Sequence, residues 1–205
     1  MDLRISMDKN IYILGASEIP SSVVMESGQK RSDIFIVPSG ASGCVDVTYE
    51  LFAEGAQLDV KGVYVCNGKQ NVDIHITVKH LSGGCVSHQL FKGIALDEAK
   101  VKFDGLVYVA HGAEKTEALQ ENHSLLLSEG ALVQSQPQLE IYADDVICSH
   151  GATVGSLDED EQFYMRSRGI SLSQARRLQI ISFLSPVLTE LPQENIDKVY
   201  GDITL

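Results

Sequence analysis

Short apolar runs bounded by Gly, Asn or Asp fill most of the chain. In each run, residues such as Val, Ile and Tyr alternate with polar ones, which is the period of a half-buried β-strand. Strands are therefore predicted over residues 34–37, 45–52, 58–65, 72–79, 101–109, 124–127 and 139–143. Before them, short strands are indicated by Ile11, Ile13, Ile19, Val23 and Val24. Almost nothing up to residue 155 has a helical period, so we expect an all-β core.

The turn residues favour one kind of all-β fold. Glycines at or near alanine recur at separations of roughly one or two steps of about twenty residues. They are Gly40, Gly55, Gly93, Gly112, Gly130 and Gly151. A repeat of this size without helices predicts a β-solenoid, in which coils stack and small residues form the corners. The alternative is that glycine marks turns in any all-β protein.

The pattern changes after Gly155, so we expect a β core over 1–155 and a C-terminal helical segment over 156–205. Acidic residues open a predicted helix over 158–168. A second helix is predicted from Ser171, a suitable N-cap, to Pro186. Its apolar stripe would consist of Leu172, Ala175, Leu178, Ile181 and Phe183. A third short element is indicated by Leu188, Leu191 and Ile196.

The net charge and the absence of long apolar runs limit the classes of partner and the cellular locations to be expected. The formal net charge of −12 disfavours nucleic acid and anionic membrane surfaces. No run reaches the roughly 18 apolar residues of a membrane helix, and residues 1–10 show no secretory signal. The cytoplasm is therefore the expected location. The four cysteines are then expected to be thiols, ligands or core residues rather than disulfides.

Cys148 and His150 are the candidate metal ligands. The period of two that runs through Leu139 and Ile141 continues through Val146 to these two residues. Residues two apart on a strand project from the same face, so the thiol and the imidazole could reach one metal or cluster. The alternative is a buried thiol beside a hydrogen-bonded histidine.

The other cysteines carry a weaker signal. Cys44, Cys66 and Cys85 follow one another at 22 and 19 residues, and Cys148 comes 63 residues later. With coils of about twenty residues, these thiols would stack as a soft-metal ladder on one solenoid face. The alternative is a column of small buried residues.

Motifs for catalysis are absent from the sequence. There is no phosphate-binding loop of the Gly-x-x-x-x-Gly-Lys-Ser/Thr type and no Gly-x-Ser-x-Gly elbow. Asp144 and Asp145 are adjacent and would point to opposite faces of a strand, so they cannot form an acid–base pair. We therefore expect that the protein is not an enzyme.

Several motifs near the C-terminal end occur in a specific order. They are Gln136-Pro137-Gln138-Leu139-Glu140-Ile141, Asp144-Asp145-Val146, Cys148-Ser149-His150-Gly151-Ala152-Thr153, Phe163-Tyr164 and Arg166-Ser167-Arg168-Gly169-Ile170. This series resembles the C-terminal part of the SufB/SufD family, the scaffold subunits of the Suf iron–sulfur cluster assembly machinery. The Cys-Ser-His-Gly segment is more similar to SufD than to SufB.

The resemblance implies a fold and a function. It implies a right-handed parallel β-helix, that is, a β-solenoid, with a small C-terminal helical segment. It also implies a SufD-like scaffold or accessory subunit that pairs with a SufB-like subunit or with itself as a homodimer. A SufC-like ABC ATPase would bind the helical segment, where the expected contact residues are Phe163, Tyr164, Arg166, Arg168 and Leu178.

The resemblance also gives Cys148 and His150 a role. They would lie at the interface between paired subunits and contact iron or a nascent iron–sulfur cluster. No tightly bound cofactor is expected, only transient cluster or iron. The competing hypothesis is a structural interaction protein that keeps the fold without binding any cluster.

Overall fold

The computed structural model describes residues 7–203. Residues 1–6, part of the segment in which no secretory signal was predicted, lie outside the described residues. The strands are β1 (Asp8–Ile13), β2 (Ser22–Met25), β3 (Lys30–Val37), β4 (Gly43–Leu51), β5 (Gln57–Cys66), β6 (Asn71–His80), β7 (Val86–Ala95), β8 (Lys100–Val109), β9 (Glu117–Leu126), β10 (Leu132–Ile141) and β11 (Ile147–Gly155).

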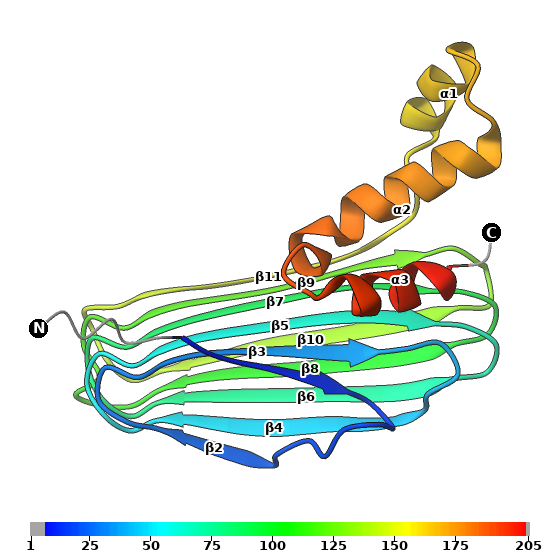
Figure 1. Ribbon diagram of the computed structural model, residues 1–205. Coiled ribbons are helices and arrows are strands. Elements are labelled where there is room, and N and C mark those ends of the chain that lie inside the picture. The colour runs from blue at the N-terminus through cyan, green and yellow to red at the C-terminus, as the bar shows by residue number, and fades with distance from the viewer. Residues whose placement is uncertain (1–6, 204–205) are drawn as a thin grey trace, which may run out of the picture.

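These strands form two parallel sheets of a β-solenoid (Figure 1). One sheet has the order β1-β3-β5-β7-β9-β11 and the other has the order β10-β8-β6-β4-β2. Each coil therefore adds one strand to each sheet, and each strand pairs in parallel with the strand of the next coil. The predicted all-β solenoid core is confirmed.

The coils are longer than the predicted repeat of about twenty residues. Lys30, Gln57, Val86 and Glu117 are successive register partners, so these coils contain 27, 29 and 31 residues. The shorter repeat came from treating every glycine in the series as a corner. Gly40, Gly55, Gly112 and Gly130 do lie in turns, whereas Gly93 lies inside β7 and Gly151 inside β11.

The interior of the solenoid is built from alternating residues. In β6, Val72, Ile74, Ile76 and Val78 are buried, and the residues between them are half-buried on the outer face. Stacked coils bring equivalent positions into register, so apolar inward positions form a continuous core between the sheets. The alternating pattern predicts that burial of these inward side chains is the main contribution to the stability of the fold.

Helices cover part of the outer face of the odd-numbered sheet. They are α1 (Glu159–Ser167), α2 (Leu172–Leu188) and α3 (Gln193–Gly201). Residues 34–37 and 63–66 are buried without alternation, because α2 and α3 pack over the outward residues there. In Figure 1, α1 lies at the far end of α2, away from the sheets. No helix within residues 7–203 is long and apolar enough to cross a membrane.

The predicted helices exist, but α2 differs from the prediction in two respects. It continues past Pro186 to Leu188. Pro186 has no N–H to donate to the Ser182 carbonyl, and this carbonyl instead accepts a hydrogen bond from Ser185 Oγ at 2.9 Å. The predicted stripe is also only partly buried. Ala175 is buried and Ile181 and Phe183 are half-buried, whereas Leu172 and Leu178 are exposed. The other buried residues of α2 are Ile180, Leu184, Val187 and Leu188.

Candidate functional site

The C-terminal end of the solenoid is open. β10 and β11 are the last strands of their sheets, and no described element pairs with their outer edges. Several large apolar side chains are exposed there, namely Leu132, Ile141, Tyr142, Ile147 and Val154. Ile147 is 74% exposed. Unpaired strand edges that carry apolar side chains are typical of a surface that another chain covers.

Cys148 and His150 both lie in β11 at this open end. Their register partners in β9 are Ala118 and Gln120, which are buried and face the solenoid interior. Parallel, in-register strands keep the same facing, so Cys148 and His150 also face inward, on one side as expected. They do not continue the strand of Leu139, which belongs to β10 in the opposite sheet.

The two side chains differ in environment. Cys148 is half-buried and packs with a small apolar cluster that contains Val107 and Ala118. This burial raises the pKa of the Cys148 thiol, and a backbone hydrogen bond at Ala118 partly opposes the shift. The thiol is therefore protonated at neutral pH and must lose its proton when it binds a metal. His150 is exposed and offers a ring nitrogen at the same open end.

The remaining cysteines do not form a ladder, so that prediction is wrong. Cys44 is exposed in β4, in the sheet opposite Cys148. Cys66 ends β5 and Cys85 precedes β7, at opposite ends of the strands, and both are buried. Burial raises the pKa of Cys66 to about 12, which disfavours a thiolate. The ladder depended on the twenty-residue repeat, which the coils do not have.

The polar side chains just beneath the open end were not predicted from the sequence. Gln89 in β7, Gln120 in β9 and His150 in β11 are successive register partners. Gln89 and Gln120 are fully buried. They could have been found by spacing, since the three residues are 31 and 30 apart, one coil each.

The predicted partner-binding residues of the helical segment are exposed. Phe163 is 72% exposed, Tyr164 60% and Leu178 48%, and the Arg168 guanidinium lies 5.0 Å from the centre of the Tyr164 ring. Phe163 and Arg166 line one hollow and Leu178 lines another, and both hollows share Ile170. Phe163, Arg166 and Leu178 thus lie at neighbouring hollows, while Tyr164 and Arg168 lie against each other. We call α1, α2 and the turn between them the helical arm (residues 159–188).

A comparison with known protein families shows to which family the chain belongs. The profile of the SufBD core domain of the SUF system for iron–sulfur cluster assembly matches residues 27–183. The chain belongs to the SufBD family. The match includes the open end with Cys148 and His150 and most of the helical arm.

Individual SufBD relatives agree with the profile. The iron–sulfur cluster assembly protein SufD of Escherichia coli is 39% identical over 147 residues, 72% of this chain and 35% of that protein. SufD of Bacillus subtilis is 38% identical over 151 residues, 74% of this chain and 35% of that protein. The chloroplastic protein ABCI7 of Arabidopsis thaliana is 35% identical over 187 residues, 89% and 39% respectively. The chain thus matches little more than a third of the length of these relatives.

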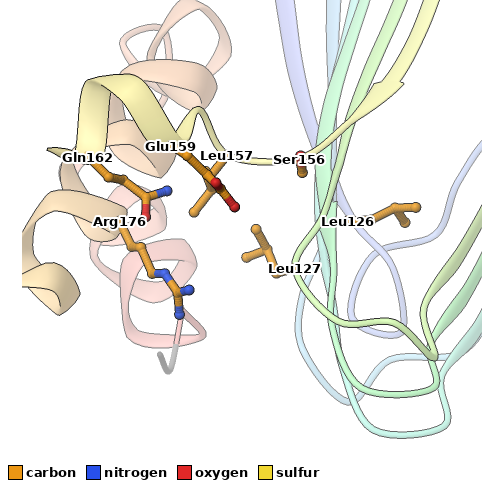
Figure 2. A pocket seen from close by; sticks show the side chains of 7 residues that line it. All are labelled: Leu126, Leu127, Ser156, Leu157, Glu159, Gln162 and Arg176. Atoms are coloured by element: carbon orange, nitrogen blue, oxygen red, sulfur yellow. The ribbon is translucent and has the colours of Figure 1, made fainter.

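The junction between the solenoid and the helical arm contains a hollow of about 170 Å³ (Figure 2). Its lining residues are Leu126, Leu127, Ser156, Leu157, Glu159, Gln162 and Arg176. Gln162 is buried and donates a hydrogen bond to Gln179 Oε1 at 3.0 Å, which joins α1 to α2. None of the predicted site residues lines this hollow, so we do not include it in the candidate site.

Proposed function

We propose that the chain acts as a SufD-like scaffold or accessory subunit in iron–sulfur cluster assembly. The observation that carries the proposal is the open solenoid end, where Cys148 and His150 face inward from one strand. Membership of the SufBD family and the likeness to two proteins named SufD support this assignment. The chain works by binding other proteins and transient cargo, and it does not catalyse a reaction.

The open end pairs with a SufB-like subunit or with a second copy of this chain. The unpaired edges of β10 and β11 provide backbone donors and acceptors, and Ile147 and Val154 provide apolar surface that association removes from water. A second solenoid end has matching edges, so pairing covers both ends at once.

Cys148 and His150 contact iron or a nascent cluster as cargo. A thiolate and an imidazole are both iron ligands, and mixed ligation of this kind occurs in iron–sulfur centres. Two ligands cannot complete a cluster, so the paired subunit supplies the others. A site shared between two chains opens when they separate, which suits a cluster that must be passed on.

The helical arm binds a SufC-like ABC ATPase. Phe163 and Tyr164 expose aromatic surface on α1, while Leu178 extends the apolar surface along α2. Arg166 and Arg168 add positive charge beside these side chains, so the partner surface should be apolar with acidic residues at its margin. The packing of α2 on β5 and β7 connects this contact to the solenoid.

The competing function is a structural interaction protein that binds the same partners without cargo. Anaerobic co-expression with a SufB-like subunit, followed by iron and sulfide analysis of the purified complex, separates the two. Our proposal predicts a complex that contains iron and acid-labile sulfide. A complex without either would favour the structural role, and the absence of any complex would contradict both.

The expected cytoplasmic location stays a prediction. One relative, ABCI7, is named as a chloroplastic protein, so family membership does not determine the compartment. Fractionation of cells that express the chain from its own locus, with detection by a specific antibody, tests the prediction.

A further inference from the structure

A buried pair of amides lies directly beneath the open end. Gln120 Nε2 donates a hydrogen bond to Gln89 Oε1 at 3.2 Å, and both side chains are at most 1% exposed. The bond joins adjacent coils inside the solenoid. It fixes the orientation of the Gln120 amide, because one end of the amide is already engaged.

The other end of this amide is unsatisfied. Gln120 Oε1 is buried and has no hydrogen-bond partner among the described residues. A buried acceptor without a partner is unfavourable, and such groups in native proteins usually receive a donor from protein or water. The next coil toward the open end could supply this donor, because its strand β11 pairs in register with β9.

Gly105 makes room for this arrangement. The Gln120 side chain crosses the interior to β8, and a Cβ at Gly105 would overlap its amide nitrogen. Gly105 is fully inside the strand, where glycine is otherwise unfavourable. The absence of a side chain at Gly105 therefore leaves the space that the Gln120 amide occupies.

Only one inward residue of β11 carries a nitrogen donor. The inward positions are Cys148, His150, Ala152 and Val154, and His150 is the register partner of Gln120. In-register residues on neighbouring strands lie about 4.8 Å apart, so a ring at His150 is within reach of the amide oxygen. His150 is exposed and can therefore turn about its own side-chain bonds.

We propose that Gln120 is a positioning residue for His150, whose ring N–H donates to Gln120 Oε1. This bond holds the imidazole in a single tautomer and leaves the other ring nitrogen with its lone pair free at the open end. A second hydrogen bond of this kind commonly orients a histidine that binds a metal. That this lone pair binds iron rests on the proposed function. The hydrogen bond between His150 and Gln120 does not depend on it.

The test is nuclear magnetic resonance of the full chain with labelled histidine nitrogen, without metal and at mildly alkaline pH, where imidazoles are neutral. Loss of signals in His150→Ala assigns the ring. We expect one dominant tautomer in the wild type. In Gln120→Leu the tautomer ratio should shift at least about fivefold toward that of free imidazole, which is the effect of one ordinary hydrogen bond. Gln120→Glu, which keeps the acceptor, should restore the dominant tautomer.

Two further variants distinguish a specific effect of Gln120 on the His150 ring from a nonspecific loss of packing in the interior. Gly105→Ala displaces the amide while Gln120 remains, and should shift the ratio in the same direction. Asn122→Leu is the matched control, because Asn122 is another buried amide with an unpartnered oxygen, but its register partner is Ala152. It should leave the His150 ratio unchanged.

An unchanged ratio in Gln120→Leu, or an equal shift in Asn122→Leu, would overturn the inference. A wild-type ring that already has the ratio of free imidazole would also overturn it. The measurement needs no iron, so a chain that never binds iron would refute the proposed function and leave this result standing.

Discussion

The ring of Tyr64 in β5 occupies the space that a side chain at Gly93 in β7 would need. The two residues are register partners on neighbouring coils. One position earlier on the inward face, the relation is reversed, and Phe91 of β7 lies over Gly62 of β5. Tyr64 and Phe91 are therefore each matched by a glycine on the adjacent coil.

Replacement of Gly93 by Ala should destabilise the fold. The new methyl group would overlap a fully buried ring that has no free space to enter, and overpacking of this kind typically costs about 1–3 kcal/mol. Urea unfolding measures the loss. Gly151→Ala is the control, since nothing lies within 4 Å of a Cβ there. Equal stability of Gly93→Ala and the wild type would contradict the packing.

His80 should make stability depend on pH. It is fully buried, its Nε2 lies 2.8 Å from Ser87 Oγ, and burial lowers its pKa to about 4. The unfolded chain, with an ordinary histidine pKa near 6.5, binds the extra proton first. The free energy of unfolding should therefore fall as pH decreases from about 6.5 to about 4, by about 3 kcal/mol in total.

The variant His80→Gln isolates this contribution. Glutamine can still bond Ser87 but does not titrate, so its unfolding free energy should depend less on pH over that range. His88→Gln, at an exposed position of β7, is the control and should keep the wild-type dependence. Parallel curves for His80→Gln and the wild type would show that His80 is not the source.

How far the sequence predicts the fold depends on which side chains face inward. Where inward positions are apolar, as in β6, the period of two predicted the strand to within one residue at either end. β7 was missed because its inward positions include Ser87, Gln89 and Gly93, which break the apolar alternation. β9 was predicted only at its C-terminal end, since Gln120 and Asn122 face inward there.

The site was predictable in part for the same reason. Spacing along one strand was enough to place Cys148 and His150 on one face. The amide pair beneath them depends on contacts between coils, and the coil length was misjudged from glycines that lie in strands. Apolar residues lie on several sides of α2. The sequence alone therefore could not show that Leu178 is exposed while Ile180 is buried.

Ile147→Lys should disrupt pairing at the open end. A charge at this exposed edge position of β11 would be buried by a second solenoid end, which is unfavourable. Sedimentation of the wild type should show a species of twice 22.3 kDa, and the variant should shift toward the single chain. Val24→Lys, at an exposed position on the edge strand β2 at the other end, should pair normally. A wild type that remains a single chain at micromolar concentration, with or without a SufB-like subunit, would contradict the proposed interface.

Charge reversal of Arg166 and Arg168 should weaken capture of the ATPase. Both side chains are exposed beside Phe163 and Tyr164, so the change alters the surface without affecting the core. A pull-down with the cognate ATPase should retain at least about tenfold less protein, and Phe163→Ala should act in the same direction. Lys69→Glu is the control, because it also reverses a charge but at a side chain that is 84% exposed in the turn between β5 and β6. Undiminished capture by the doubly reversed chain would refute the docking surface.

Anaerobic reconstitution with iron and sulfide, in the presence of a SufB-like subunit, tests directly whether Cys148 and His150 contact iron. Visible absorbance and iron content are compared for the wild type, Cys148→Ser and His150→Ala, with Cys44→Ser as the control that removes an exposed thiol elsewhere. We expect the wild type and Cys44→Ser to take up iron equally, and Cys148→Ser and His150→Ala each to retain much less. Equal iron in all four proteins would contradict the assignment of Cys148 and His150 as the cluster-contacting site.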